Sequence, residues 1–500
     1  MATRRVRARP VRRRVRVAII GAGFGGIAAA VNLRKRTSAD FVIFEKAAGV
    51  GGTWWHNRYP GCEVDVHSHA YSFSFARYDW PRTHATQPEL LRYSEEIVEL
   101  FSLRPHLRLS TEVTAVRWLD DEARYELRTA AGDTEYFDVV ISAVGLLSVP
   151  RIPDWPGLAN FGGVAFHSAE WPAGLDLAGR RVAVVGTGST AAQVVPAVAE
   201  QASMLAVFQR EPGWIEPKLE RAFRPAERWV YRTVPGAQRV HRAWLFYKAA
   251  RRGLAFDLGN RRQAERRGAC EAFIESAVAD PSVRASVTPG YPWGCKRVVL
   301  ASTFYAALNR ENVELVPHAV TSVTHSGVVD ETGAERAVDV LVMSTGFQPT
   351  KFLTTLDVRG AGGISLREAW RSRTAAYLGI TVAGFPNFFI LYGPNTNGAG
   401  SIIAQLERQA EFAVRAVAGI ERGRWRYVDT DRAAQDRYVA WIDRQLAAHA
   451  SAMDSGCTNY YHDSSGANIT QWPSSHLKYL VTVRALGRRG LRPTRFTASG

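Results

Sequence analysis

Two segments of this 500-residue chain share one order of elements: an apolar strand, a glycine-rich turn, a helix and a second strand. In the first segment, the β-branched run over 15–20 enters a turn that holds Gly21, Gly23 and Gly26. The second strand ends at Glu45, about 20 positions after the third glycine, as in dinucleotide-binding βαβ units. This feature restricts the fold more than any other in the sequence.

The second segment begins with a strand over 182–185 and turns at Gly186-Thr187-Gly188-Ser189-Thr190-Ala191. Its second strand leads to Arg210, at the spacing seen in the first segment. Because glycine has no Cβ, such a turn lets the backbone approach a pyrophosphate, and the next helix offers its free N–H groups. One turn is a weak indication, but two in register predict an α/β fold with two Rossmann-like dinucleotide-binding domains.

The residue that ends the second strand indicates which nucleotide each domain binds. A carboxylate accepts a hydrogen bond from a ribose 2′-OH and repels a 2′-phosphate, so Glu45 favours FAD or NAD. Arg210 stands at the equivalent point of the second domain, where a guanidinium can grip a phosphate through two N–H groups. We therefore predict FAD in the first domain and NADPH in the second.

Segments that interrupt regular structure predict where these domains begin and end. The proline-rich stretch over 149–157 marks a boundary, and the turn over 384–387 marks a return to the first domain. Residues 214–290 lose strand signals and have helical composition. The predicted parts are a basic tail over 1–14, a discontinuous FAD-binding domain over 15–148 and 385–500, and an NADPH-binding domain over 149–384 with a helical insertion at about 214–290.

Charge and hydropathy restrict the partners. The net charge of +16 owes much to the arginine-rich start of the chain, which we interpret as a solvated tail. A nucleic-acid arm, a membrane-surface arm and a targeting segment are the alternatives for that tail. The rest of the sequence holds no apolar run long enough to span a membrane, so we expect a cytoplasmic protein without a nucleic-acid partner.

The cysteines bear on the redox chemistry. Cys62, Cys270, Cys295 and Cys457 are far apart, and their spacing predicts neither a disulfide framework nor a metal site. Disulfide reductases pair FAD and NADPH with two redox-active cysteines just after the first βαβ unit, where this chain has only Cys62. Oxygen is therefore the expected acceptor of the electrons.

Two longer motifs resemble the fingerprints of type I Baeyer-Villiger monooxygenases. The pattern GxWxxxx(F/Y)P(G/M)xxxD is met between Gly52 and Asp65. The pattern FxGxxxHxxxW(P/D) is met over 161–172, which reads FGGVAFHSAEWP and includes His167. Further similarity extends the resemblance over most of the chain, from residue 15 to about residue 473.

The resemblance implies roles for individual residues. Arg297 would stabilise a negatively charged C4a-peroxyflavin, and Asp65 would position Arg297. Lys296 and Arg210 would contact the NADPH 2′-phosphate. The implied activity is the insertion of one oxygen atom from O2 next to the carbonyl of a small hydrophobic ketone, which gives an ester or lactone. Without the motif context, Asp65 could simply cap a loop and Arg297 could be a structural ion-pair partner.

The predicted catalytic residues are thus Arg297 and Asp65, with no metal. The predicted cofactor-binding residues come from both turns, the first fingerprint and the segments around them: Gly21, Gly23, Phe24, Gly26, Glu45, Gly52, Thr53, Trp54, Asp65, Tyr71, Val113, Gly186, Thr187, Gly188, Ser189, Thr190, Arg210 and Lys296. Trp54 and Tyr71 could equally be core residues or a wall for the isoalloxazine ring.

Three positions depart from the pattern of many relatives, namely Leu146, Glu211 and Tyr460. A carboxylate at Glu211, beside Arg210, would oppose a 2′-phosphate and weaken the preference for NADPH. Two other functions stay open: a flavin monooxygenase that oxidises nitrogen or sulfur of a small hydrophobic substrate, and a non-catalytic flavoprotein that binds nucleotides.

Overall fold

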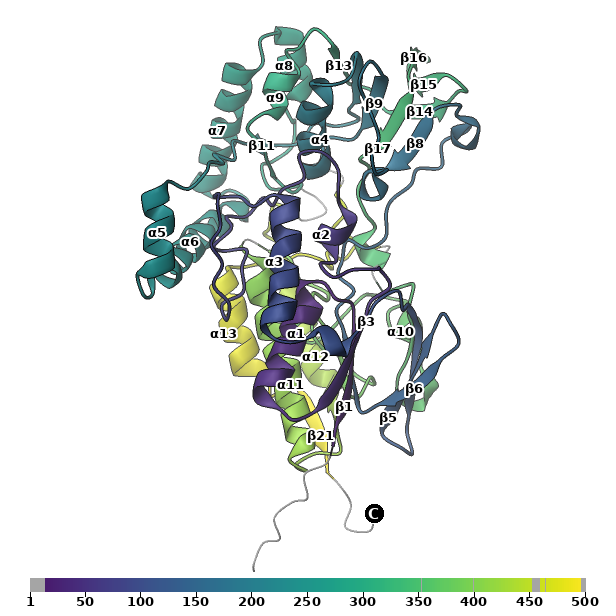
Figure 1. The fold of residues 1–500 in the computed structure, drawn as a ribbon, viewed down its shortest axis with the longest axis vertical. Coiled ribbons are helices and arrows are strands. Elements are labelled where there is room, and N and C mark those ends of the chain that lie inside the picture. Colours follow the sequence, from purple (N-terminus) through teal and green to yellow (C-terminus); the bar gives the residue numbers. More distant parts are fainter. Residues whose placement is uncertain (1–13, 352, 399, 452–458, 464, 496–500) are drawn as a thin grey trace, which may run out of the picture.

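The computed structural model describes residues 14–351, 353–398, 400–451, 459–463 and 465–495. The predicted basic tail falls outside this part of the chain except for Arg14, which pairs with Asp40. Two five-stranded parallel sheets organise the molecule, one in the lower half of Figure 1 and one in the upper half.

The first sheet has the order β19-β7-β1-β2-β3, and all its neighbouring strands are parallel. Its strands are β1 (Arg16–Ile20), β2 (Asp40–Phe44), β3 (Leu107–Arg108), β7 (Val139–Ser142) and β19 (Phe388–Ile390). The β1 core positions are fully buried because helices cover the sheet, which is why the strand is a continuous apolar run. The last strand comes from the C-terminal third of the chain.

The second sheet has the order β13-β10-β9-β17-β8 and is also parallel throughout. Its strands are β8 (Val164–His167), β9 (Arg181–Val185), β10 (Met204–Phe208), β13 (Val313–Val316) and β17 (Val340–Met343). In each sheet the central strand, β1 or β9, leads into a glycine turn. These two parallel sheets confirm the predicted α/β fold with two Rossmann-like units.

A helix follows each glycine turn. Helix α1 (Phe24–Arg36) is buried over most of its length, because it packs between the first sheet and α11 (Ile402–Glu421). Helix α4 (Ser189–Ala199) follows the second turn and packs against α9 (Phe304–Ala307). The short α2 (Thr53–His56) packs against the longer α3 (Gln87–Leu100), which in turn contacts α1.

Smaller sheets flank the two main ones. One combines β4 (Val113–Leu119), β5 (Arg124–Thr129), β6 (Thr134–Phe137) and β18 (Asp357–Arg359). Another contains β14 (Val320–Val323), β15 (Gly327–Asp330) and β16 (Glu335–Ala337). Because β18 pairs with β4 of the first half, we propose that the second domain ends before residue 357 and not at 384.

Residues 214–290 form mainly helices: α5 (Pro225–Thr233), α6 (Ala237–Gly253), α7 (Arg261–Ala277) and α8 (Pro281–Val287). The short strands β11 (Ile215–Glu216) and β12 (Val299–Leu300) pair at the base of this segment. Near the C-terminus lie α10 (Leu366–Ala369), α12 (Arg432–Leu446), α13 (His476–Leu486), β20 (Tyr427–Thr430) and β21 (Leu491–Thr494). Among the helices of the described residues, none is both long enough and apolar enough to cross a bilayer.

Candidate active site

A cavity of about 1740 Å³ lies between the two glycine turns. It is lined by both turns, by the first fingerprint and by the segment that carries Arg297, so the two predicted nucleotide sites open into one space. All predicted site residues line this cavity except Gly26.

The first turn shows why Gly26 does not face the cavity. Gly21 has a φ of +104°, and a Cβ there would lie 2.7 Å from the carbonyl oxygen of Ala143. A Cβ on Gly26 would lie only 1.9 Å from the carbonyl oxygen of Gly21. Gly26 therefore allows α1 to approach the turn closely, which is the packing role of the third glycine in this motif.

The carboxylate of Glu45 closes the first turn. It is buried, and its two oxygens accept hydrogen bonds from the backbone N–H of Ala22 at 2.7 Å and of Ala47 at 2.8 Å. Each carboxylate oxygen can accept a second hydrogen bond, so the group can also bind a ribose hydroxyl. The structure thus holds Glu45 rigidly at the point where the motif predicts a ribose.

In the second turn, the middle glycine has more open space around it than in the first turn. Gly186 has a φ of +119°, and a Cβ there would lie 2.4 Å from the carbonyl oxygen of Ser344. A Cβ on Gly188 would meet nothing within 4 Å. Gly23 and Gly188 are the N-caps of α1 and α4, and neither helix has a side-chain cap. The first N–H groups of both helices are therefore suited to bind phosphate.

Arg210, Glu211 and Lys296, which the sequence relates to the NADPH 2′-phosphate, all line the cavity. Arg210 follows β10 and is exposed. Lys296 forms an ion pair with the carboxylate of Glu211, whose backbone carbonyl accepts a hydrogen bond from the Thr187 hydroxyl at 3.3 Å. Glu211 thus engages one of the two cations that the sequence predicts for the phosphate.

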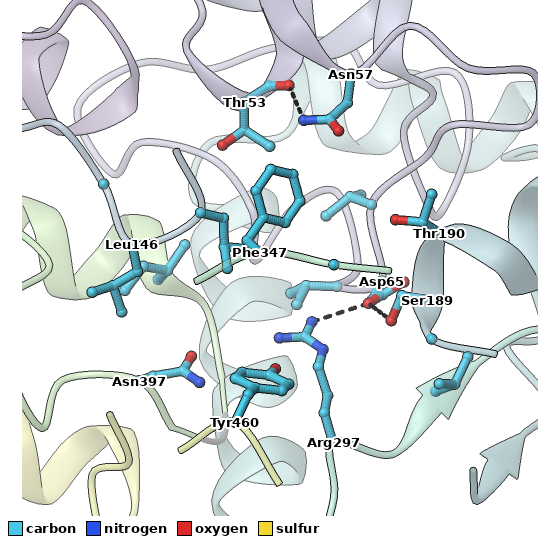
Figure 2. A pocket seen from close by; sticks show the side chains of 18 of the residues that line it. Thr53, Asn57, Asp65, Leu146, Ser189, Thr190, Arg297, Phe347, Asn397 and Tyr460 are labelled. Carbon is cyan, nitrogen blue, oxygen red and sulfur yellow. Dashed lines mark hydrogen bonds and ion pairs between the residues drawn. The ribbon is translucent and has the colours of Figure 1, made fainter. Parts of the chain in front are cut away.

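The predicted catalytic pair is formed in the structure. An Nη atom of Arg297 donates a hydrogen bond to Asp65 at 3.0 Å, as Figure 2 shows. The Arg297 side chain is 45% exposed, into the cavity, whereas that of Asp65 is only 13% exposed. Burial opposes the charge on Arg297, but the neighbouring carboxylate outweighs it and raises the pKa of the guanidinium. Arg297 therefore stays positively charged.

Side chains of α4 hold Asp65 from the other side. The hydroxyl of Ser189 lies 3.4 Å and the amide nitrogen of Gln193 lies 3.5 Å from the Asp65 carboxylate. Gln193 also donates to the carbonyl of Glu63 at 3.0 Å and accepts from the Tyr59 hydroxyl at 3.1 Å. Sequence reasoning missed Gln193, although it stands one helical turn after Ser189 on the same face of α4.

Apolar and aromatic side chains surround Arg297. Tyr460 lies beside Arg297 in Figure 2, and Leu146, Phe347 and Asn397 line the same cavity. Tyr392 also lines the cavity and donates to Asn397 at 3.0 Å, and burial raises the pKa of Tyr392 to about 12. The environment is thus mostly apolar, with uncharged hydroxyl and amide groups.

Trp54 and Tyr71 form another part of the wall. The indole N–H of Trp54 lies 3.2 Å from the Tyr71 hydroxyl, and the two rings meet edge to face. Asn57 also lines the cavity, and its amide donates to the carbonyl of Thr53 at 2.9 Å. Asn57, like Asn397, was missed as a site residue because a lone amide forms no motif in the sequence.

His167 is fully buried and does not line the cavity. Its Nδ1 accepts from the backbone N–H of Ala169 at 3.2 Å, so its Nε2 donates to the carbonyl of Gly346 at 2.9 Å. Both ring nitrogens are therefore engaged, and the residue links the second fingerprint to the segment after β17. The geometry fits a packing role and offers no general base.

The cysteines differ in one respect from what their spacing predicts. Cys295 is disulfide-bonded. Cys62 lines the cavity as a free, buried thiol, and burial raises its pKa to about 12. A thiol with so high a pKa is a poor nucleophile, so Cys62 is not suited to be the reactive thiolate of a disulfide reductase.

The chain is similar to known proteins over nearly its whole length. Residues 18–228 match the family model described as pyridine nucleotide-disulphide oxidoreductase. A Baeyer-Villiger monooxygenase of Streptomyces coelicolor is 40% identical, over 95% of this chain and 92% of that protein. The solved structure of cyclohexanone monooxygenase from Rhodococcus sp. Phi1 bound to NADP+ superimposes with a TM-score of 0.87, at 31% identity, over 96% of this chain and 99% of that one.

A second solved structure, of OTEMO in complex with FAD and NADP, has a TM-score of 0.85 at 28% identity and covers 97% of this chain and 100% of its own. Both solved structures therefore match this chain over nearly its whole length. On this identity and coverage, the chain belongs to the Baeyer-Villiger monooxygenase family of enzymes.

Proposed function

We propose that this enzyme uses FAD, NADPH and O2 to insert one oxygen atom next to the carbonyl of a small hydrophobic ketone, giving an ester or lactone. The observation that carries the proposal is the ion pair between Asp65 and Arg297, formed inside the cavity that both glycine turns line. NADPH supplies two electrons, one oxygen atom enters the product, and the other leaves as water.

The residues present fit both cofactors. Two turns with glycines at the positions of closest approach, each followed by a helix without a side-chain cap, suit two pyrophosphates. Glu45 suits the ribose of FAD and Arg210 suits the 2′-phosphate of NADPH. When bound and reduced, FAD supplies the electrons that activate oxygen.

Arg297 would keep a permanent positive charge at the point where oxygen carries negative charge. A guanidinium is suited to this role because its pKa lies far above neutrality and its neighbour raises it further. Asp65 would orient that charge and would itself be held by Ser189 and Gln193. A charge fixed in advance stabilises a developing anion without reorganisation during the reaction.

The apolar wall would select the substrate and exclude water. Leu146, Phe347 and Tyr460 offer no charge to a substrate, so they favour an apolar ketone near Arg297. Exclusion of water also strengthens the attraction between Arg297 and an oxygen anion, since the local dielectric constant falls.

The test supplies the FAD-loaded enzyme with NADPH, isotopically labelled O2 and separate panels of ketones, amines and sulfides. We expect an ester or lactone that carries one labelled atom, with one NADPH consumed for each product. Labelled products from amines or sulfides alone would favour the nitrogen- or sulfur-oxidising alternative. Bound nucleotides with no substrate-dependent product would favour the non-catalytic alternative.

A further inference from the structure

Large apolar side chains are exposed on three neighbouring helices, α5, α6 and α13. Val240 is 72% exposed, Tyr247 58% and Trp244 51%, all on α6. Other exposed apolar residues are Trp229 and Val230 on α5, Val234 directly after α5, and Leu477 and Val481 on α13. Because α6 contacts both α5 and α13, and all three lie on the left side of the molecule in Figure 1, their outer faces form one surface. We call these outer faces of α5, α6 and α13 the docking surface.

Helix α6 is apolar on two sides for different reasons. Val240, Trp244, Tyr247 and Arg251 recur at the helical period and form its outer stripe. Leu245 and Phe246 belong to the inner side, which lines the active-site cavity. The inner side already supplies the apolar contacts of α6 with the rest of the protein. The outer aromatic residues are therefore not needed for packing within the protein. An exposed apolar patch of this kind marks an interaction site.

The charge of the docking surface is positive. Residues 225–262 contain nine arginines and lysines but only two acidic residues, and α13 has no acidic residue. One of the two, Glu227, is engaged by Arg221. Four of the nine, Arg228, Arg242, Arg252 and Arg261, pair with carboxylates of Asp79, Glu407, Glu216 and Glu265, so the positive charge of the surface comes from the others. Arg239, Lys248 and Arg251 are exposed on α6. Lys248 also lines the cavity, and its ammonium group lies 4.3 Å from the centre of the Trp244 ring. Cations and aromatic rings are thus interleaved.

We propose that the docking surface binds an anionic lipid bilayer. Tryptophan and tyrosine favour the boundary between headgroups and acyl chains, and each nearby arginine or lysine is attracted by anionic headgroups. A second copy of this chain is a poorer partner, since a symmetric dimer would place the same cations against one another. The inner side of α6 would then place the cavity wall beside the lipid. If the proposed function holds, an apolar ketone dissolved in the bilayer would be held close to the active site.

The experiment measures sedimentation of the full-length, FAD-loaded protein with vesicles. One set is phosphatidylcholine with about one third phosphatidylglycerol, and the other is pure phosphatidylcholine. We expect binding to the anionic vesicles at about 0.1 M salt, little binding to the neutral ones, and release at about 1 M salt. The protein is assayed without turnover, so failure of the proposed oxygenation would leave this result unaffected.

Two double variants separate the apolar and the ionic contributions. Trp244→Ser with Tyr247→Ser, and Arg239→Gln with Arg251→Gln, should each weaken binding to anionic vesicles at least about tenfold. Matched controls lie on other faces: Val164→Ser on β8 and Arg117→Gln on β4 should bind like the wild type. None of these side chains lines the cavity, so the substitutions should leave FAD binding intact. A circular dichroism spectrum and an amount of bound FAD like those of the wild type then show that each variant is folded.

Three results would overturn the proposal. The first is wild-type protein that stays in the supernatant with anionic vesicles. The second is a loss of binding in the control variants equal to that in the α6 variants. The third is a stable dimer in the absence of lipid that Trp244→Ser with Tyr247→Ser disperses, which would assign the surface to a second copy of the chain.

Discussion

The carboxylate of Asp65 and the guanidinium of Arg297 meet at 3.0 Å, although 232 residues separate them in the chain. Asp65 follows the first glycine unit, Arg297 lies just before β12, and the Ser189 hydroxyl that contacts Asp65 belongs to the second unit. The ion pair therefore joins the two nucleotide-binding halves. Any change in how the halves pack should move Arg297, so the site depends on the assembled structure.

Removal of the Arg297 charge should separate flavin reduction from oxygenation. In Arg297→Ala, we expect NADPH to reduce FAD normally while formation of the oxygenated product falls at least about 100-fold. Arg297→Lys keeps a charge but loses the planar fork, so it should recover only part of the activity. Stopped-flow absorbance measures the first step, and product analysis measures the second. Wild-type product formation in Arg297→Ala would refute the assignment.

Asp65 should act through Arg297. Asp65→Ala should lower product formation about tenfold, and Asp65→Asn should lose less because it retains a hydrogen-bond acceptor. The double variant Asp65→Ala with Arg297→Ala should be no worse than Arg297→Ala alone, since the two residues act as a unit. The rate of product formation in the four proteins tests this, and additive losses would mean that Asp65 has an independent role.

Glu211 should weaken the preference for NADPH over NADH. Its carboxylate pairs with Lys296 beside the predicted 2′-phosphate position. Glu211→Thr should release Lys296 and lower the KM for NADPH about tenfold, which corresponds to about 1.4 kcal/mol. Arg210→Ala should raise the KM for NADPH and leave that for NADH unchanged. Equal changes with both coenzymes in Glu211→Thr would show that the carboxylate does not sense the phosphate.

The two glycines of the second turn should respond differently to a methyl group. In Gly188→Ala, the Cβ meets no protein atom within 4 Å, so the protein should fold and keep FAD. It should bind NADPH at least about tenfold more weakly, because the methyl group occupies space next to the phosphates. In Gly186→Ala, the Cβ meets a carbonyl oxygen at 2.4 Å, so stability itself should fall. Thermal unfolding and coenzyme titration distinguish the two, and the reverse pattern would contradict this interpretation.

A histidine cluster should make stability depend on pH. His67, His69 and His84 pack near His241 of α6, and Nδ1 of His69 lies 3.0 Å from Nδ1 of His241. Burial lowers the pKa of His67 to about 2 and the pKa values of His69 and His84 to about 4. The charged groups around the cluster raise some of these pKa values and lower others; they are Asp65, Asp79, Arg82, Lys218, Glu220, Arg221 and Arg242.

Each of these histidines is less basic in the folded protein than in the unfolded chain, where its pKa is near 6.5. The free energy of unfolding should therefore be highest above pH 6.5 and fall as the pH drops, because the unfolded chain gains protons first. The contributions of His69 and His84 are lost by about pH 4, and that of His67 continues to fall to about pH 2. For His69 alone, the loss is on the order of 3 kcal/mol. Denaturant unfolding across this range should show a smaller slope in His69→Gln. An unchanged slope would mean that His69 does not titrate on unfolding.

Local patterns predicted the parts of the site that are local in the structure. The glycine turns, Glu45 and Arg210 could be placed because strand, turn and helix are adjacent in sequence and each imposes its own backbone requirement. The helical composition over 214–290 predicted helices there. The sequence could not place β18 beside β4, because three residues of strand find their partner only through the packing of the whole domain.

The sequence alone therefore determined the two dinucleotide-binding units and the family fingerprints, and it predicts FAD in the first unit and NADPH in the second. The tertiary structure decided that Asp65 meets Arg297, that Glu211 engages Lys296, and that the aromatic stripe of α6 faces outward. The physical reason is distance along the chain. A turn or cap depends on neighbouring residues, whereas an ion pair across 232 residues or an exposed helix face exists only after every intervening element has packed.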